Sequence, residues 1–369
     1  MSRPRFLVGA IAAVAVWAVG VVGLVQHGVA APTGLAAKPS ARSGYAWSAG
    51  GTAPTCDTAP YSFNSSGGLV CVHNDNGGAG QSQASFAGLP KFRPANAEVT
   101  TYSADGTCRI NGWRGFKQSV VVNVACFSFS GIPQDGEYTV LITSPASRPR
   151  GVLDFAGVVL GRRGPAVPAA FSFNSSHRVN KVKSLGKGRY QVTFPGPAAR
   201  GTTGVVHVSG WVSGTCEVTA WHGTPSGEVV DIGCHDSRGK FLDLPFDVTY
   251  VRGNNLMGLN GATDANAYAG RPAAPSPYQP ADQYDSAPGA RVTVARIATG
   301  EYKVTLAGSG GRYRANGGDV QVSSVGTHDD HCQTLGWVQG KTPVAYVQCF
   351  TNGGVTTNSP FTIEWVVAG

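Results

Sequence analysis

The chain has 369 residues and a formal net charge of +8; only 14% of its residues are charged, whereas 51 are glycine and 23 are proline. This composition argues against a helical protein and favours short strands joined by tight turns. The length allows two or three domains. The net charge is too small to indicate a partner by itself.

The N-terminal residues have the pattern of an export signal. Arg3 and Arg5 form a basic start, Phe6 to Val25 is an uncharged apolar run, and small residues follow at 29–31. This predicts either a signal peptide (1–30) that is cleaved or an anchor (6–25) that is retained. With a short tether at 31–43, either alternative predicts that the rest of the chain is secreted or extracellular.

One sequence pattern occurs three times. Gly80–Gly88, Gly188–Gly196 and Gly300–Gly308 share the form Gly-x-x-x-x-x-x-x-Gly, and the second and third copies also share Tyr-x-Val-Thr. Each copy is followed by two cysteines with a tryptophan five residues after the first cysteine. A recurring pattern of this kind predicts an array of similar modules. Their expected ranges are 44–145 for module 1, 151–252 for module 2 and 265–369 for module 3.

Module 2 shows the expected strands most clearly. Seven short segments have alternating apolar residues: 171–174, 179–183, 189–194, 205–209, 216–221, 229–234 and 246–251. Seven short strands in about 100 residues are typical of an immunoglobulin or fibronectin type III β-sandwich. The predicted fold class is therefore all-β, with three tandem β-sandwich modules after the N-terminal signal segment.

The eight cysteines form an even set in the exported part of the chain, where disulfides are the default. An antiparallel hairpin that pairs Cys216 with Cys234 also sets Val218 against Ile232, so apolar residues share the cysteines' face. Equivalent registers predict the other bonds, and the remaining two cysteines form the last pair. The predicted bonds are Cys56–Cys71, Cys108–Cys126, Cys216–Cys234 and Cys332–Cys349.

The same register places each tryptophan on the face opposite the cysteines. Trp113, Trp221 and Trp337 are the residues concerned. Two interpretations stay open: the indole covers the other side of the hairpin, or it forms a surface on which a sugar or other ligand stacks.

The sequence contains none of the local motifs of zinc proteases, serine hydrolases or phosphate-binding loops. The expectation is therefore a protein that is not an enzyme and has no cofactor. One loop of module 3 carries a four-residue insertion, His328, Asp329, Asp330 and His331. It is interpreted either as a solvated polar loop or as a candidate metal site.

Basic residues are concentrated in module 2, at Arg178, Lys181, Lys183, Lys187 and Arg189. They guard an edge strand against aggregation or bind an anionic polymer or glycan of a cell envelope. Tyr190 is the single aromatic residue among them, which argues against nucleic acid. A membrane contact is expected only through an uncleaved N-terminal segment.

The combination of an opening Tyr-Ala-like strand, Asn-Ser-Ser, Gly-x-Tyr-x-Val-x-Phe-x-Gly and Cys-x4-Trp resembles a repeat of uncharacterised secreted bacterial proteins with disulfide-stapled immunoglobulin-like modules. The resemblance covers nearly the whole exported chain and implies location and repeat boundaries, without an activity. Module 1 departs from it at Ser82 and Ala84, and module 3 has Asp285-Ser286-Ala287 in place of Asn-Ser-Ser.

These observations predict a non-catalytic extracellular binding or adhesion protein whose modules fold separately. Two alternatives stay open. One is a structural surface or matrix spacer protein, and the other is an extracellular hydrolase, with or without a metal at the module 3 insertion.

Overall fold

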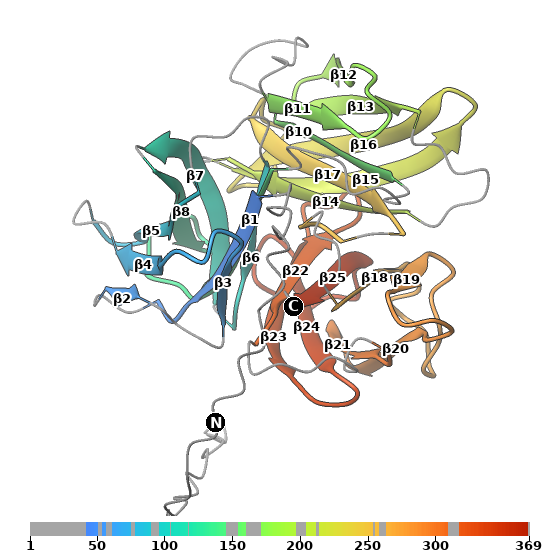
Figure 1. Cartoon of the computed structure of the whole chain (residues 1–369). Coiled ribbons are helices and arrows are strands. Elements are labelled where there is room, and N and C mark those ends of the chain that lie inside the picture. The colour runs from blue at the N-terminus through green and yellow to red at the C-terminus, as the bar shows by residue number, and fades with distance from the viewer. Residues whose placement is uncertain are drawn as a thin grey trace, which may run out of the picture. The chain divides into compact units, whose positions relative to one another are not determined.

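The computed structural model describes residues 42–367, apart from 51–53, 57–60, 75–77, 90–95, 104, 117, 145–153, 160–170, 197–203, 212–213, 254, 258–262 and 309–316. The described residues form 25 strands in six antiparallel sheets and contain no α-helix (Figure 1). None of them belongs to an apolar helix long enough to cross a membrane. The predicted signal peptide or anchor lies outside the described residues, as does the tether up to residue 41.

The strands fall into three segments, 42–144, 154–252 and 263–367. The first contains β1 (Arg42–Ser48), β2 (Thr55–Cys56), β3 (Ser62–Asn64), β4 (Val70–Asn74), β5 (Gln81–Ala87), β6 (Asn96–Thr101), β7 (Gly106–Phe116), β8 (Ser119–Ser128) and β9 (Tyr138–Ser144). The second contains β10 (Asp154–Val159), β11 (Ser172–Asn174), β12 (Lys181–Gly186), β13 (Arg189–Pro195), β14 (Gly204–Gly210), β15 (Gly214–Thr224), β16 (Gly227–Asp236) and β17 (Phe246–Arg252). The third contains β18 (Thr263–Ala269), β19 (Gln283–Asp285), β20 (Val292–Ala298), β21 (Glu301–Leu306), β22 (Asp319–Ser324), β23 (His331–Val338), β24 (Val344–Phe350) and β25 (Phe361–Val367).

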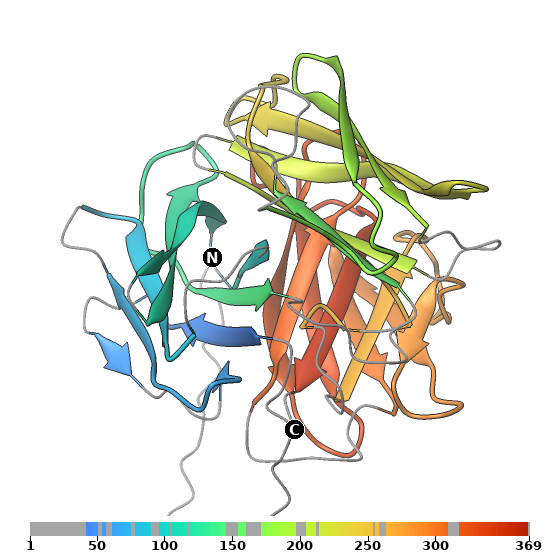
Figure 2. The ribbon, with the colours of Figure 1, turned by 45° about the horizontal axis from the view of Figure 1, so that its top comes forward.

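Each segment contributes two sheets, and the order of strands recurs between segments. We call the sheets β3-β1-β9-β6, β11-β10-β17-β14 and β19-β18-β25-β22 the inner sheets. The outer sheets are β2-β4-β5-β8-β7, β12-β13-β16-β15 and β20-β21-β24-β23. Figure 2 shows the six sheets from a second direction. In each segment a cluster of buried apolar residues includes side chains from both sheets.

Alternation of apolar and polar residues explains how the strands form. In β13 the side chains of Tyr190, Val192 and Phe194 are buried, whereas the residues between them are half-buried or exposed. Successive side chains of a strand point to opposite faces, so this alternation buries one face against the other sheet. The all-β prediction is confirmed.

The glycine that opens each repeated pattern has a conformational role. Gly80, Gly188 and Gly300 have φ angles of 78°, 65° and 70°, in the left-handed region that other residues rarely adopt. Their backbone N–H groups donate hydrogen bonds of 2.9, 2.7 and 3.0 Å to Asp135, Asp243 and Asn358, in that order. The turn therefore needs both the glycine and a polar residue about 55 positions later.

The Asn-Ser-Ser motif forms a polar turn against the neighbouring strand. In the first two segments, Oδ1 of Asn64 and Asn174 accepts bonds from the backbone and hydroxyl groups of Ser66 and Ser176. In the third segment Asp285 stands at this position, and its Oδ1 accepts from the backbone N–H two residues later, at 2.9 Å. The third segment therefore keeps the turn with a carboxylate in place of the amide.

The structure has four disulfides, which join Cys56–Cys71, Cys108–Cys126, Cys216–Cys234 and Cys332–Cys349, the pairs expected from the sequence. Three of them connect the hairpin strands β7–β8, β15–β16 and β23–β24, one in each outer sheet. The fourth ties the short strand β2 to β4. Four disulfides within one chain indicate an extracellular or otherwise oxidising environment.

The predicted register is correct near the cysteines and wrong beyond them. Val218 pairs with Ile232 as expected, but Trp221 and not Ala220 pairs with Val230, because a β-bulge adds one residue to the strand. Bulges also interrupt β7 and β23. The added residue reverses the face of every later side chain. The tryptophans therefore lie on the cysteines' face, and the prediction of the opposite face was wrong.

The segments contact one another through their inner sheets. The edge strands β6, β14 and β22 meet near the centre of Figure 1, and residues 39–369 form one compact unit. A further apolar cluster draws on all three segments, with Tyr45, Leu141, Val205, Val251 and Val366 among its buried members. These contacts argue against the expectation that the segments fold separately.

Candidate functional site

Three equivalent hydrogen bonds connect the edge strands β6, β14 and β22. In each one a backbone N–H of one segment donates to a hydroxyl oxygen of another, which satisfies a donor that an edge strand otherwise leaves unpaired. The bonds, of 3.1, 3.1 and 2.8 Å, run from Val99 to Ser209, from Val208 to Ser323 and from Val322 to Thr100. We call them the hydroxyl relay.

Buried carboxyl groups lie beside the hydroxyl relay. Glu98 accepts hydrogen bonds of 2.9 Å from the hydroxyls of Ser209 and Thr249, both in the second segment. Burial raises the pKa of Glu98 to about 8, although these two bonds oppose the shift. Burial and the neighbouring charge of Glu98 raise the pKa of Asp247 well above its usual range. Asp247 accepts a bond of 3.1 Å from the backbone N–H of Ala97 in the first segment.

Further buried titratable groups extend this polar interior. Burial raises the pKa of Asp319 to about 7 and, together with the charge of Asp285, that of Asp264 to about 7. His207 on β14 is completely buried, and neither of its ring nitrogens has a hydrogen-bond partner among the described residues. Its burial lowers the pKa to about 3, so the imidazole is neutral over the physiological range.

A cavity of about 70 Å³ adjoins the hydroxyl relay. All three segments contribute to it through their edge strands β6, β14 and β22. Each segment also contributes the first cysteine of its hairpin disulfide: Cys108, Cys216 and Cys332. Hydroxyl-bearing side chains dominate its polar lining: Thr100, Thr101, Thr107, Ser209, Thr215, Ser323 and Ser324. Arg109, Gln333 and His331 complete the nitrogen-containing groups of the lining.

The residue after the first cysteine differs in each segment. It is Arg109 in β7, Glu217 in β15 and Gln333 in β23, and each is less than 9% exposed. In an isolated amphipathic strand this position, on the face opposite the cysteine, would be exposed to water. Here other segments cover that face. Three equivalent positions therefore carry a cation, an acid and an amide in one buried region.

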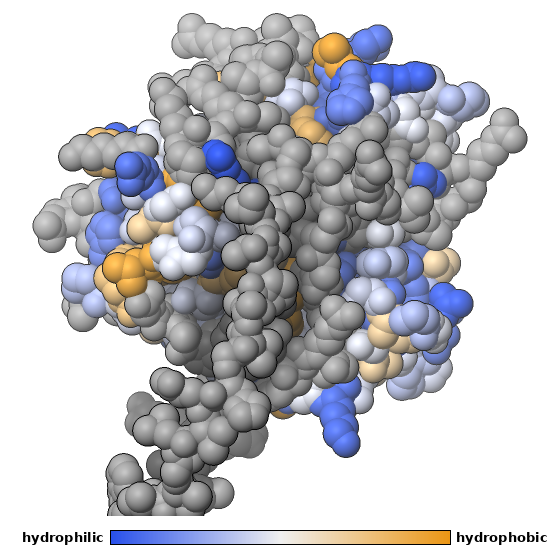
Figure 3. All heavy atoms as spheres, in the orientation of Figure 1, coloured by the Kyte–Doolittle hydropathy of each residue, from blue (hydrophilic) through white to orange (hydrophobic). Residues whose placement is uncertain are grey.

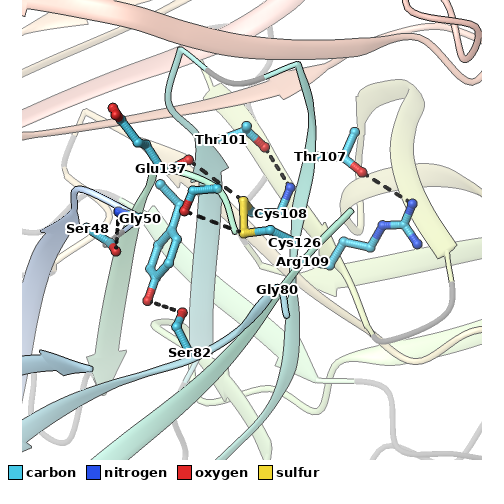
Figure 4. The surroundings of a disulfide bond; sticks show 12 residues. Ser48, Gly50, Gly80, Ser82, Thr101, Thr107, Cys108, Arg109, Cys126 and Glu137 are labelled. Atoms are coloured by element: carbon cyan, nitrogen blue, oxygen red, sulfur yellow. Dashed lines mark hydrogen bonds between the residues drawn. A yellow bond between two sulfur atoms is a disulfide. The ribbon is translucent and has the colours of Figure 1, made fainter. Parts of the chain in front are cut away.

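Arg109 is a buried cation with few contacts. Its Nη2 donates to the hydroxyl of Thr107 at 3.3 Å, and its guanidinium lies 4.8 Å from the ring centre of Phe127. Figure 4 shows the Thr107 bond and the Cys108–Cys126 disulfide beside it. Burial lowers the Arg109 pKa to about 10, and the charge of Asp329 partly opposes that shift. No described residue forms a hydrogen bond with its Nε.

The insertion of the third segment contributes one buried residue, Asp329, to a contact with the second segment. Its Oδ1 accepts a 2.7 Å bond from the hydroxyl of Thr215 and lies 3.5 Å from Nδ1 of His235. Its backbone N–H donates to Oε1 of Glu217 at 3.0 Å. Burial raises the pKa of Glu217 to about 7. This carboxyl and imidazole cluster is a contact between segments.

The four insertion residues point into different surroundings. His328 is exposed and Asp330 is half-buried. The ring of His331 stacks against Phe129 with centroids 6.4 Å apart, and burial lowers its pKa. Among the described residues no group of three or more His, Cys, Asp or Glu side chains is arranged to hold a metal ion. The metal interpretation therefore has no support from the arrangement of these residues.

Each of the three tryptophans of the repeated pattern packs on an aromatic ring of another segment. Trp113 meets Phe171 with centroids 5.7 Å apart, and Trp221 meets Tyr268 at 4.7 Å. Trp337 meets Tyr102 of the first segment at 5.5 Å, and its Nε1 donates to a backbone carbonyl at 2.7 Å. Edge-to-face aromatic pairs of this kind stabilise packing. The three indoles are part of the contacts between segments.

The basic residues of the second segment lie on and around β12. This strand is at the edge of its sheet, and the side chains of Arg178, Lys181, Lys183, Lys187 and Arg189 are all exposed. Hydrophilic side chains gather over β12 at the top of Figure 3. Arg189 also lies over the Phe241 ring, 4.3 Å from its centre. The sequence therefore identified an exposed basic edge, but it did not indicate the cavity beside Arg109.

The fold and these sites define an all-β, disulfide-bonded protein whose segments share a buried polar interior. Comparisons with protein-family models, curated proteins and solved structures give no match to the chain.

Proposed function

We propose that the chain is a secreted, non-catalytic binding protein built of three immunoglobulin-like β-sandwich modules, and that its basic edge binds an anionic polymer. The recurring strand order of the six sheets supports the modular part of this proposal. The four disulfides support export to an oxidising compartment.

The exposed edge of β12 is the observation that carries the binding part. Lys181 and Lys183 are two residues apart, so they project from the same face of the strand, about 7 Å apart along it. Among the described residues, no carboxylate oxygen lies within 4 Å of either ammonium group. Charges that have no internal partner remain available to an external anion.

The equivalent edge of the first segment is closed. There β4 is covered by β2, and the Cys56–Cys71 disulfide holds the two strands together. In the second segment β12 is the outermost strand of its sheet and carries Lys181 and Lys183. Lysines at such an edge prevent strand addition by other chains. Binding of a polyanion requires in addition that several of these lysines act together. An experiment can distinguish this binding role from the role of preventing strand addition.

The spacer alternative is disfavoured by the shared interior. Spacer arrays need only contacts between neighbours along the chain, whereas Thr100 of the first segment bonds to Val322 of the third. The hydrolase alternative has no specific support, because Asp329 is directed toward Thr215 and Glu217 within the interior.

Retention on a polyanion tests the proposal. The exported chain is passed over beads carrying dextran sulfate and over neutral dextran beads, at rising salt. We expect retention on the sulfated beads alone, weakening steeply with salt, because exposed charges are screened within about 8 Å at physiological ionic strength. Changing Lys181, Lys183 and Lys187 to glutamine is expected to remove most of the retention.

A variant with equal loss of charge provides the control. Three basic residues of the third segment are exposed: Arg291 just before β20, Arg296 on β20 and Lys303 on β21. Their replacement by glutamine also removes three positive charges. The proposal requires this variant to be retained much as the unmodified chain is. Equal loss in both triple variants would indicate a net-charge effect, and no loss in the β12 variant would exclude this edge.

A further inference from the structure

We infer that the cavity beside Arg109 is a binding site for a small oxyanion, such as phosphate, sulfate or a simple carboxylate. This site is separate from the basic edge of β12, and it does not depend on the polymer-binding proposal.

The first observation is the unpaired charge of Arg109. The residue is 7% exposed, and among the described residues its guanidinium contacts the Thr107 hydroxyl and the Phe127 ring. Within the described part of the chain, no carboxylate oxygen lies within 4 Å of the guanidinium. A buried charge without a counter-ion is costly. An anion in the adjoining cavity would supply the missing partner.

The second observation is the geometry of donors around the cavity. Arg109 lines the cavity, and its Nε has no hydrogen-bond partner within the part of the chain that the structure describes. The hydroxyl of Thr101 accepts a 2.8 Å bond from the backbone of Cys108, which leaves its proton to be donated. Gln333 also lines the cavity and carries an amide N–H₂. Guanidinium, hydroxyl and amide donors together suit the oxygens of a compact anion.

The third observation is the volume of the cavity. A cavity of about 70 Å³ has room for about five water-sized atoms, since one water needs about 10–15 Å³ of such space. Phosphate and sulfate have five heavy atoms, and acetate has four.

The other titratable groups near Arg109 leave its positive charge available to one small anion. Asp329 interacts with Arg109 electrostatically, but its Oδ1 is bonded to Thr215 on the side of Glu217 and His235. His331 lines the cavity, and burial lowers its pKa, so it adds no fixed charge. The guanidinium is therefore the charge that an anion meets within the cavity.

Thermal unfolding of the exported chain tests the site in solution. Inorganic phosphate is titrated against chloride at matched ionic strength, and we expect a saturable rise in Tm with phosphate alone, because a ligand that binds the folded state stabilises it. Arg109→Gln is expected to weaken phosphate affinity about tenfold or more, the loss of one charge-assisted hydrogen bond. Arg114→Gln removes an exposed arginine from the same strand and should leave the affinity unchanged.

Two further measurements keep the inference open to refutation if Arg109→Gln folds poorly. Thr107→Val changes the hydroxyl that positions the guanidinium and is expected to weaken the affinity severalfold. Crystals soaked in selenate are expected to show an anomalous peak within hydrogen-bond distance of Arg109. The inference is overturned by a Tm that does not respond specifically to phosphate, by equal effects of Arg109→Gln and Arg114→Gln, or by a selenate peak only elsewhere.

Discussion

The hydroxyl of Ser209 accepts the backbone N–H of Val99 at 3.1 Å and donates to Oε2 of Glu98 at 2.9 Å. One side chain of the second segment thus satisfies a backbone donor and a carboxyl group of the first. All three residues are buried or nearly so, so the two bonds form away from water, where an unmet polar group is most costly.

Ser209→Ala is expected to lower the free energy of unfolding by about 1–3 kcal/mol, because it leaves both the Val99 N–H and the Glu98 carboxyl without this partner. Urea unfolding of the exported chain measures the change. Ser226→Ala, at an exposed turn, is the control and should change stability by less than about 0.5 kcal/mol. Equal effects of the two substitutions would contradict a stabilising role for the relay.

Stability is expected to fall as pH rises from about 5 to 8. Glu98, Asp319 and Asp264 have folded-state pKa values raised to about 8, 7 and 7. A raised value means that the folded state binds protons more tightly, so the stabilisation is fully present below the unfolded pKa and is lost as pH passes through the folded value. Each acid contributes a slope of at most about 1.4 kcal/mol per pH unit.

Urea unfolding at intervals of one pH unit checks this slope. Glu98→Gln removes one of the titrating groups and is expected to flatten the plot of unfolding free energy against pH. Glu301→Gln, on β21 of the third outer sheet, is the control and should leave the slope of this plot unchanged. The pKa of His207 is lowered to about 3, so its contribution has the opposite direction and is lost as pH falls below about 6.5. Because three acids oppose one histidine, maximum stability is expected between about pH 4 and 5, and a curve that rises toward pH 8 would exclude this account.

A fragment of residues 151–252 is expected to be much less stable than the exported chain. Alone it would expose Val205 and Val251, which are completely buried in the cluster shared by all segments. Losing the burial of one such side chain costs about 1.5–3 kcal/mol. Circular dichroism and urea unfolding compare the two proteins. A fragment with the same unfolding midpoint as the whole chain would restore the expectation of separately folding modules.

Asp329→Ala is expected to destabilise the exported chain by about 1–3 kcal/mol, because it removes the acceptor of the buried Thr215 bond. Measuring Tm with and without a chelator separates this role from metal binding. We expect the chelator to leave the Tm of the unmodified chain unchanged. A chelator that reproduces the loss caused by Asp329→Ala would favour the metal interpretation of the insertion.

The strands and disulfides could be predicted because their signals are local. The alternation of Tyr190, Val192 and Phe194 requires only a neighbouring sheet, and the spacing of Cys216 and Cys234 fits one hairpin. The bulge before Trp221 could not be predicted, because one extra residue leaves the composition of a strand unchanged while reversing its faces.

The shared interior and the Arg109 cavity were not predicted for a different reason. Glu98 stands between Ala97 and Val99, and His207 stands between Val206 and Val208, as exposed residues of an amphipathic strand do. The surroundings of Glu98 come from strands more than 100 residues away in the chain, such as the one that carries Thr249. A buried polar residue that is covered by a distant segment has the same sequence pattern as a solvated one.

The hydroxyl relay constrains the number of segments that such a chain can have. Its bonds run from the first segment to the second, from the second to the third and from the third back to the first, so the sequence of donors and acceptors is cyclic. Duplicating or deleting one segment would break the cycle and leave an edge strand with an unmet N–H. Open arrays tolerate such changes in copy number, whereas a closed cycle fixes it.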